Sequence, residues 1–325
     1  MRILYIPSGF SGVYHFFDDC IVRECNNEDN TCSLFNHYKG FNSLKSKVEE
    51  FKPDLVLTLT GFLLSPKITE WLKSQNIKLA VWMTEDPYYM DASISVISRY
   101  DYVFTIDRSA LEFYLETCHP NAYLLPLGTD PNIFSSKIDV GEKQMHDICL
   151  VGFPYPERIN IINLLLEKTS YSIQVVGTKW KDELEQWKEN KLLKIIDWSA
   201  PEIVARYYNS AKIVLNTHRP YDLGENKNSM KIINKGINNR TFDIAACGAF
   251  QLISYQSDLY RYFSENEMVA FKGEEDLLSK ICFYINNEKK RKQIAIKARE
   301  KVLKHHTFAN RIKELTTIIQ KNGFN

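Results

Sequence analysis

The chain has 325 residues, of which 44% are hydrophobic and 25% are charged, so its composition is that of a globular protein and excludes a disordered or fibrous one. Its 41 basic and 40 acidic side chains leave a net charge of +1, which excludes the broad positive field that holds a nucleic-acid backbone. We therefore expect no nucleic-acid partner. A chain of this length has room for two domains.

The cysteine pattern and the apolar runs narrow the class of protein further. The seven cysteines are odd in number and form no Cys-x-x-Cys pair, so we expect neither a disulfide framework nor a bound metal. Residues 1–7 lack the features of a signal peptide, and no apolar run approaches the roughly 20 residues that span a bilayer. We expect a cytoplasmic protein without a membrane span.

Short apolar runs alternate with amphipathic stretches in the first half of the chain. We predict strands at residues 3–6, 55–59, 79–83, 102–106 and 122–125. We predict helices at residues 13–25, 66–75 and 109–116. This alternation is typical of strand-helix-strand units on a parallel sheet, and it predicts a first domain over residues 1–127.

The same alternation begins again at Asp147. We predict strands at residues 147–152, 173–177, 193–196, 213–216 and 251–254, and helices at 158–167, 201–210 and 241–247. Residues 128–146 are polar and charged, as a linker should be. The repetition predicts an α/β protein with two Rossmann-like domains that face each other across a cleft. The second domain covers residues 147–305, and residues 306–325 form a C-terminal helix that can pack back on the first.

The segment 238–250 has the layout of a ligand-binding helix start. Asn238 and Asn239 can cap a short helix, and Gly248 can end it. Arg240 and Asp243 then lie beside free backbone N–H groups, where an arginine can bind phosphate and a carboxylate can bind sugar hydroxyls. The simplest ligand with both groups is a nucleotide or a nucleotide-sugar. The long polar loop before this helix, residues 219–236, is predicted to act as a lid.

Three sequence strings in the second half resemble a known family. They are L-N-x-H at residues 215–218, N-x-R-T-F-[DE]-I-x-A-x-G-x-F at 238–250 and H-T-F-x-x-R at 306–311. Upstream strings, among them W-x-x-E-D-P at 82–87 and V-G-F-x-Y-x-x-R at 151–158, follow in matching order. Together they resemble the CgeB/YkvP spore-maturation family of glycosyltransferase-like proteins over nearly the whole chain.

The resemblance implies a two-domain GT-B glycosyltransferase fold, with parallel sheets facing a central cleft. It also implies a nucleotide-sugar donor in the second domain and no metal or other cofactor. No Asp-x-Asp motif occurs in the sequence. The donor-binding residues predicted on this basis are Gly152, Arg158, Gly177, Trp180, Trp198, Asn216, His218, Asn238, Arg240, Thr241 and Asp243. Asp243 stands where the family more often has glutamate, which shortens the reach to a ribose.

Each predicted donor contact has its own physical reason. Gly152 lets the backbone approach a diphosphate, and Arg158 at a helix start can neutralise it. Trp180 and Trp198 follow consecutive strands, and either ring can stack on the base. His218 follows the end of a strand within a polar segment, where carboxyl ends of parallel strands bind ligands.

Transfer to a hydroxyl with inversion requires a general base, which the first domain should supply. Glu85 and Asp86 follow the strand at 79–83, so we predict one of them as the base, with His15 as the second choice. A retaining enzyme needs no such base, and the sequence leaves inversion and retention open. The turn Gly9-x-x-Gly12 lacks the spacing of a dinucleotide-binding loop, so a dehydrogenase is not favoured.

We therefore predict a glycosyltransferase that moves a sugar from a nucleotide-sugar, with a UDP-sugar as the leading choice, to a glycan or protein acceptor. The resemblance also implies a role in spore-surface maturation and a location on the mother-cell side of a developing spore. The alternatives are a UDP-sugar 2-epimerase on the same fold and a non-catalytic protein that assembles a surface layer.

Overall fold

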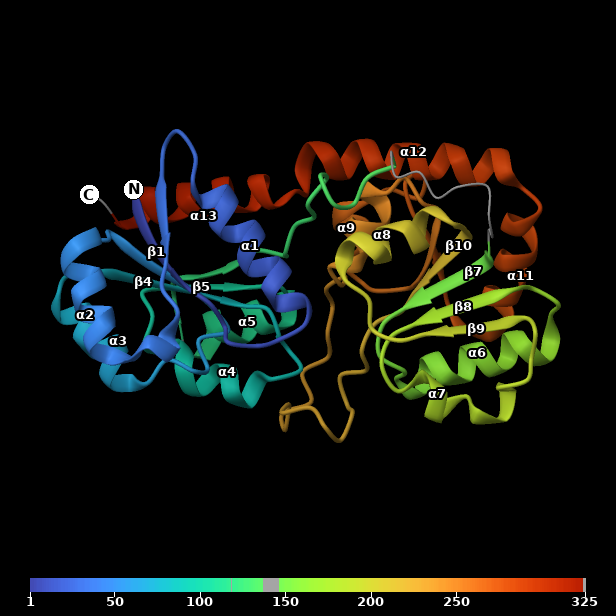
Figure 1. Ribbon diagram of the computed structural model, residues 1–325, viewed down its shortest axis with the longest axis horizontal. Helices are drawn as coiled ribbons and strands as arrows, with labels where there is room; N and C mark the ends of the chain where they lie inside the picture. Colours follow the sequence, from blue (N-terminus) through green and yellow to red (C-terminus); the bar gives the residue numbers. More distant parts are fainter. Residues whose placement is uncertain (118, 137–145, 324–325) are drawn as a thin grey trace. The chain divides into compact units, whose positions relative to one another are not determined.

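The computed structural model describes residues 1–117, 119–136 and 146–323, and the chain divides into two units built from interleaved segments. Unit 1 comprises Met1–Gly128, Tyr221–Gly236 and Phe308–Asn325, and unit 2 comprises Thr129–Pro220 and Ile237–Thr307 (Figure 1). The two units are therefore not two consecutive halves of the chain. Residues 137–145 of the predicted linker lie outside the described residues.

Unit 1 is built on a sheet of six parallel strands. They are β1 (Arg2–Ile6), β2 (Thr31–Leu34), β3 (Leu55–Leu59), β4 (Lys78–Met83), β5 (Tyr102–Thr105) and β6 (Ala122–Leu124). Their order across the sheet is β2-β1-β3-β4-β5-β6, and β1, for example, pairs Ile3 with Leu55 of β3. The central strands are buried on both faces, which is why they read as continuous apolar runs.

Helices cover both faces of this sheet. Helices α1 (Val13–Cys25) and α13 (Phe308–Gly323) pack on one face. Helices α2 (Gly40–Phe51), α3 (Pro66–Ser74), α4 (Met90–Ile97) and α5 (Arg108–Thr117) pack on the other face (Figure 1). A 3-10 turn, η1 (His37–Lys39), precedes α2.

Unit 2 repeats the architecture with another strand order. Its strands are β7 (His146–Val151), β8 (Ile173–Val176), β9 (Leu193–Ile196), β10 (Ala211–Asn216), β11 (Gln251–Ser254) and β12 (Val269–Phe271). They are parallel and ordered β12-β11-β10-β7-β8-β9. The strand order reverses between β7 and β10, and this switch point is where open α/β sheets bind ligands.

The helices of unit 2 also lie on both faces of the sheet. They are α6 (Pro156–Lys168), α7 (Trp180–Glu183), α8 (Pro201–Asn209), α9 (Arg240–Ala246), α10 (Leu259–Tyr262), α11 (Gly273–Ile285) and α12 (Glu288–His305), with a 3-10 turn η2 (Glu185–Trp187). Helices α6, α7 and α11 share one apolar core with the sheet, whereas α8 and α9 contact β7, β10 and β11 from the other side (Figure 1). The predicted α/β class with two Rossmann-like parallel sheets is confirmed.

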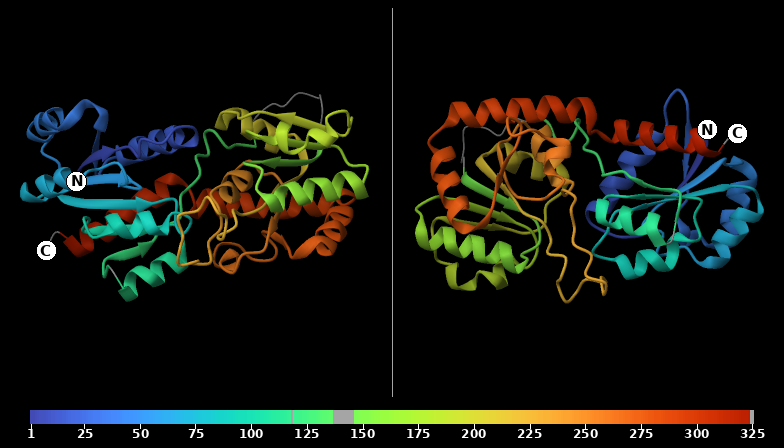
Figure 2. Two further views of the ribbon diagram at one scale, coloured as in Figure 1. Left: turned by 90° about the horizontal axis from the view of Figure 1, so that it is seen from below. Right: turned by 180° about the vertical axis from the view of Figure 1, so that it is seen from behind.

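The segment Tyr221–Gly236, which we call the strap, leaves β10 of unit 2 and is bonded to unit 1. The carboxylate of Asp107 accepts the backbone N–H groups of Lys235 at 2.9 Å and Gly236 at 2.7 Å. Asp91 accepts the N–H group of Ser229 at 3.0 Å. The strap is extended and has no helix or strand of its own (Figure 2). The loop predicted as a lid is therefore held on unit 1 by backbone hydrogen bonds.

Candidate functional site

The carboxyl ends of β7 and β10 lie side by side at the switch point of unit 2. The two strands pair in register, with Val214 opposite Cys149 and Leu215 opposite Leu150. Gly152 follows the end of β7, and Thr217 and His218 follow the end of β10. Because neighbouring parallel strands end at the same edge, these residues form one cluster.

Gly152 has φ +136°, and no side chain fits at its position. A Cβ atom there would lie 2.6 Å from Nη1 of Arg158 and 2.8 Å from Nη1 of Arg240. Gly177, after β8, has φ +148°, and a Cβ atom there would lie 2.5 Å from the carbonyl oxygen of Gly152. The lack of a side chain at Gly152 thus lets two guanidinium groups approach the backbone. The lack of one at Gly177 lets the chain after β8 pack against the Gly152 carbonyl.

The two arginines converge on the peptide of Thr217. Arg158 is 2% exposed and donates to the Thr217 hydroxyl and carbonyl oxygens, both at 2.8 Å, and to the Phe153 carbonyl at 2.7 Å. Arg240 is half-buried and donates to the same Thr217 carbonyl at 3.2 Å. These hydrogen bonds all go to uncharged oxygens, so they leave the charge of the guanidinium pair available to an anion.

His218 lies beside these arginines as a buried, neutral imidazole. Its Nδ1 is 3.0 Å from the Ser254 hydroxyl, and its Nε2 is buried without a hydrogen-bond partner among the described residues. Burial, together with the nearby Arg240 and Arg158 guanidinium groups, lowers the pKa of His218 to about 3. A buried ring nitrogen without a partner next to two cations is a vacant hydrogen-bonding position at an electropositive site.

A buried amide network lies under this cluster. Asn216 donates to Thr241 Oγ1 at 3.0 Å and to Gln251 Oε1 at 3.1 Å, and it accepts from Asn238 at 2.9 Å. Asn238 in turn accepts the backbone N–H of Thr241 at 3.2 Å, whereas Asn239, the residue directly before α9, makes no side-chain capping hydrogen bond. Asn216 and Thr241 are at most 1% exposed. The prediction that these two contact the donor is therefore wrong, because both are used inside the fold to position Asn238 and α9.

Asp243 is buried within α9 and faces the start of that helix. It is 5% exposed, and its Oδ2 accepts from the Asn239 side chain at 3.0 Å. Burial raises the pKa of Asp243 to about 8, although the Thr129 hydroxyl and Arg240 act in the opposite direction. At neutral pH the carboxyl is therefore largely protonated, and it can donate a hydrogen bond as well as accept one.

The structure separates the two tryptophans that sequence reasoning left as alternatives. Trp180 has no exposed surface, packs in the core of unit 2 and donates its indole N–H to the Gly152 carbonyl at 2.7 Å. The prediction that Trp180 stacks on a base is therefore wrong. Trp198, by contrast, is 54% exposed just after β9. An exposed indole at the carboxyl edge is free to stack on a planar ligand.

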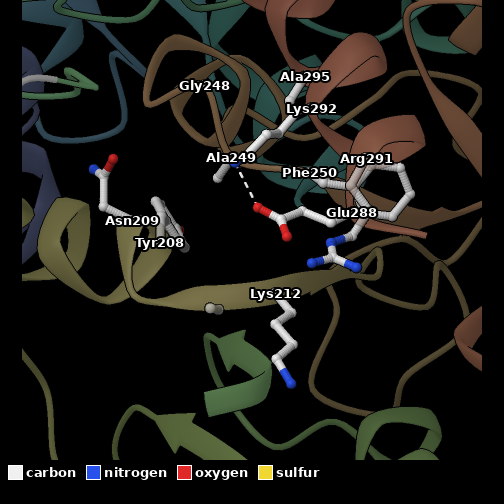
Figure 3. A pocket seen from close by; sticks show the side chains of 11 residues that line it. Tyr208, Asn209, Lys212, Gly248, Ala249, Phe250, Glu288, Arg291, Lys292 and Ala295 are labelled. Atoms are coloured by element: carbon white, nitrogen blue, oxygen red, sulfur yellow. Dashed lines mark ion pairs between the residues drawn. The ribbon is translucent and has the colours of Figure 1, made fainter. Parts of the chain in front are cut away.

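A small cavity of about 130 Å³ lies at the other edge of the sheet of unit 2 (Figure 3). Three cations line it, and two of them pair with carboxylates: Lys212 pairs with Asp147 at 2.7 Å, and Lys292 pairs with Glu288 at 2.5 Å, while the third is Arg291. Lys212 lies near the start of β10, whereas His218 follows its end. This cavity is therefore distinct from the arginine cluster.

In unit 1 the predicted base Glu85 is half-buried at the carboxyl end of β4. The hydroxyl of Tyr14, on α1, donates to Glu85 Oε1 at 2.5 Å and lies 2.9 Å from the Thr84 hydroxyl. Burial and the nearby Glu85 carboxylate raise the pKa of Tyr14 well above its usual value, so Tyr14 keeps its proton. The hydrogen bond fixes one carboxylate oxygen of Glu85.

Asp86 is not placed to act on a substrate. It is 1% exposed, and its carboxylate accepts hydrogen bonds from Ser93 at 2.6 Å, Thr105 at 2.7 Å and Tyr114 at 2.7 Å. Burial raises the pKa of Asp86 to about 6 despite these three donors. The prediction of Asp86 as a base is therefore wrong, because its oxygens are engaged within the core of unit 1. His15, the second choice, is exposed on α1.

Several functional candidates were missed from sequence. Thr217 lies within the string Asn-Thr-His-Arg directly after β10, so its position at a strand end was a usable signal. Tyr14 and Ser254 gave no such signal, because their roles depend on contacts with residues far along the chain. Among the described residues there is no group of three His, Cys, Asp or Glu side chains that could hold a metal ion. Nor does the described part of the chain contain a helix long and apolar enough to cross a membrane.

Comparisons with known proteins agree with this architecture. A family profile described as glycosyl transferase-like matches residues 158–317. The spore protein CgeB of Bacillus subtilis (strain 168) is 35% identical over 297 residues, which cover 91% of each chain.

Solved structures show the same fold at low sequence identity. Sucrose-phosphate synthase from Thermosynechococcus elongatus superposes with a TM-score of 0.71 at 11% identity, covering 99% of this chain and 98% of the other. HepE of Anabaena in complex with UDP and glucose superposes with a TM-score of 0.69 at 11% identity, covering 99% and 100%. The predicted GT-B fold and the predicted family resemblance are both confirmed.

Proposed function

Because the chain belongs to the family of the spore protein CgeB and has a glycosyl transferase-like region, we propose that it transfers a sugar from a UDP-sugar to a glycan or protein acceptor. The observation that carries the proposal is the cluster at the switch point of unit 2. There, two guanidinium groups meet beside a neutral histidine whose Nε2 is buried without a partner among the described residues. A diphosphate supplies both the charge and the acceptor oxygens that such a cluster lacks.

In this proposal the donor is held in three parts. Arg158 and Arg240 bind the diphosphate, and His218 donates from Nε2 to one of its oxygens. Asp243, as a carboxylic acid, binds a ribose hydroxyl at the start of α9. Trp198 stacks on the uracil ring, a role that its exposure allows. The similarity in fold to HepE, which was solved with UDP and glucose, supports the choice of UDP.

The chemistry that we propose is a direct displacement at the anomeric carbon. The acceptor oxygen forms a bond to that carbon while the bond to the diphosphate oxygen breaks. The leaving diphosphate takes the electron pair and is stabilised by the two guanidinium groups. Glu85 takes the proton of the acceptor hydroxyl, with Tyr14 holding the carboxylate in position. The reaction consumes no metal and no cofactor other than the donor.

The cellular setting is also a proposal. The relationship to a spore protein supports a role in maturation of the spore surface, with the protein acting in the cytoplasm on the mother-cell side. The acceptor in that setting is a glycan or a protein.

Calorimetry with a panel of UDP-, GDP- and dTDP-sugars tests the donor, followed by product analysis. We expect a UDP-sugar to bind with the highest affinity and UDP to be released only when an acceptor is present. Conversion of the sugar to its 2-epimer without an acceptor would show an epimerase instead. No binding of any nucleotide-sugar at millimolar concentration would refute the enzyme and leave the alternative of a surface-layer assembly protein.

A further inference from the structure

Two cysteines of unit 1 lie on neighbouring elements of the same core. Cys25 is the last residue of α1 and has no exposed surface, and Cys32 is half-buried in the edge strand β2. Cys25 belongs to the apolar cluster that the sheet forms with α1 and α13, and Cys32 packs against that cluster. The cysteines that the structure describes are all free thiols. This pair is therefore a candidate site for a reaction between two thiols.

The register of β2 turns the side chain of Cys32 towards α1. Cys32 pairs with Ile3 of β1, and the side chains of paired residues in neighbouring parallel strands lie on the same face of a sheet. Ile3 is fully buried in the cluster to which α1 contributes. The thiol of Cys32 therefore lies on the face that α1 covers, where Cys25 ends the helix.

The turn between the two cysteines is held by its own hydrogen bonds. Asn26 follows Cys25 directly, and its side-chain oxygen accepts the backbone N–H of Cys32 at 2.8 Å. Within the turn, Asn27 donates its backbone N–H to the Asn30 carbonyl at 3.1 Å. The fold thus holds the end of α1 and the start of β2 together before any covalent bond is made.

The two thiols interact with each other and differ in acidity. A hydrogen bond with Cys25 lowers the pKa of Cys32 against the effect of burial, and a hydrogen bond with the backbone of Tyr5 also lowers it. The hydrogen bond with Cys32, together with burial, raises the pKa of Cys25 well above its usual value. Because the thiolate is the nucleophile in thiol chemistry, Cys32 is the residue that reacts first and Cys25 is its partner.

We propose that Cys25 and Cys32 form a reversible disulfide with a low-molecular-weight disulfide as the oxidant, and that this bond links the end of α1 to the edge strand β2. The Cys32 thiolate attacks one sulfur of the small disulfide, and the other sulfur leaves as a thiolate that takes up the proton released by Cys32. Cys25 then attacks the Cys32 sulfur, and the second small thiolate leaves with the proton that Cys25 has lost. Two protein thiols are oxidised, and one small disulfide is reduced to two thiols. The proposal does not depend on the transferase function.

Burial and contact set the order of the two steps. Cys25 has no exposed surface, so a small disulfide reaches Cys32 first. Once Cys32 is part of a mixed disulfide it has neither proton nor charge, so its hydrogen bond and its charge no longer raise the pKa of Cys25. The Cys25 sulfur can then displace the small thiol in an intramolecular step, which a high effective concentration favours. We therefore expect the closed disulfide to accumulate and the mixed disulfide to stay minor.

Peptide mass spectrometry on the full chain tests the proposal. The protein is exposed to glutathione disulfide, its free thiols are blocked with N-ethylmaleimide, and it is digested with trypsin without reduction. Cleavage after Arg23 and Lys39 releases one peptide, residues 24–39, that contains both cysteines and no other. We expect this peptide to lack two hydrogen atoms, with the closed form exceeding the glutathione-bound form at least about tenfold. Dithiothreitol should restore both thiols.

Two variants and one exposed cysteine separate the roles of the two thiols. Cys25→Ser should leave a mixed disulfide on Cys32, and Cys32→Ser should leave Cys25 unmodified because Cys25 is buried. Cys282, exposed on α11, is the internal control and should bind glutathione without forming an internal bond. A peptide 24–39 that takes glutathione on both cysteines, or that stays reduced while Cys282 reacts, would overturn the proposal.

The same reaction in urea tests whether the fold brings the two thiols together. In the unfolded chain Cys25 meets Cys32 only through random motion of the segment between them, whereas the folded chain holds them by the turn and by the register of β2. We expect the ratio of closed to mixed disulfide to fall at least about tenfold in urea. An equal ratio in both states would show that closeness in sequence drives the reaction, and it would overturn the proposal.

Discussion

The two units share one architecture but place opposite chemistry at the carboxyl ends of their strands. In unit 2 this edge carries Arg158 and Arg240 beside a neutral His218. In unit 1 it carries Glu85, held by the hydroxyl of Tyr14. A parallel sheet therefore fixes where a site lies, whereas a few residues after each strand decide which chemistry it supports.

The difference suggests a division of labour. An edge where two guanidinium groups meet at the Thr217 carbonyl suits an anionic leaving group. An edge with a carboxylate and a hydroxyl suits a neutral nucleophile that must lose a proton. If this division is right, variants in unit 1 should change turnover and leave donor affinity alone, and variants in unit 2 should do the reverse.

The largest effect is expected at Glu85. Replacing Glu85 by Gln removes the proposed base, so we expect kcat to fall by roughly 10²- to 10⁴-fold while UDP affinity is unchanged. Steady-state kinetics and calorimetry on the same preparation measure both quantities. Tyr14→Phe keeps the carboxylate but loses its hydrogen bond, and it should reduce kcat by a smaller factor. Full activity of Glu85→Gln, with retention of configuration in the product, would show that no base is needed.

A large effect on stability is expected at the buried carboxyl of unit 1. The pKa of Asp86 is raised to about 6 in the folded chain, against about 3.9 when unfolded. Its contribution to stability is thus complete below pH 4 and is lost as the pH rises through 6. The side chain of Asp86→Asn does not titrate. From pH 3 to pH 7 the free energy of unfolding of this variant should therefore rise by about 3 kcal/mol relative to that of the unaltered protein.

Urea unfolding at the two pH values measures this difference. Asp29→Asn, at an exposed position of the same unit, is the control. If the two variants change in stability with pH by the same amount, burial does not raise the pKa of Asp86.

In unit 2 the expected effect falls on donor affinity. Arg240→Ala removes one of two guanidinium groups, so we expect UDP to bind about 100-fold more weakly, or on the order of 2.7 kcal/mol. Arg206→Ala is the matched control, because this exposed arginine lies in the last turn of α8, ahead of the start of β10. Isothermal titration calorimetry of both variants with UDP measures the two affinities. If Arg240→Ala and Arg206→Ala bind UDP equally well, Arg240 does not bind the diphosphate.

The smallest effect is expected where the strap is bonded to unit 1. Asp91→Ala removes the acceptor of the Ser229 N–H and hydroxyl groups, so the strap should open more often and be cut by chymotrypsin a few times faster. Glu116→Ala, an exposed carboxylate of the same unit, should leave the cleavage rate unchanged. An unaltered rate in Asp91→Ala would mean that the other bonds of the strap, among them those to Asp107 and Tyr88, hold it without Asp91.

Much of the fold could be predicted because parallel strands buried on both faces read as apolar runs. The strands at 55–59, 193–196 and 251–254 were predicted with the bounds that the structure shows. The edge strands β2 and β12 were missed: they have only four and three residues, and β2 is partly exposed. Helix α2 was missed as well.

The site was harder to predict than the fold. A position directly after a strand gives the location of a residue in the sheet, but it does not give the contacts of its side chain. Arg158 and Arg240 do lie together beside Gly152, while their contact with a donor stays a prediction. Trp180, Asp86 and Asn216 occupy similar positions in sequence, yet each turns inward to buried partners. Whether a polar residue after a strand faces solvent or core depends on neighbours that are distant in sequence.

The interleaving of the two units has a consequence for biosynthesis. Helix α13 covers one face of the sheet of unit 1, yet it is synthesised after every segment of unit 2. Until then, apolar residues of β1 and β3 that α13 will cover remain exposed, while all of unit 2 has already been made. We expect unit 2 to reach its native state first, although the residues that begin the sequence belong to unit 1. A nascent chain stalled before Phe308 should therefore depend more on chaperones than a chain that includes α13.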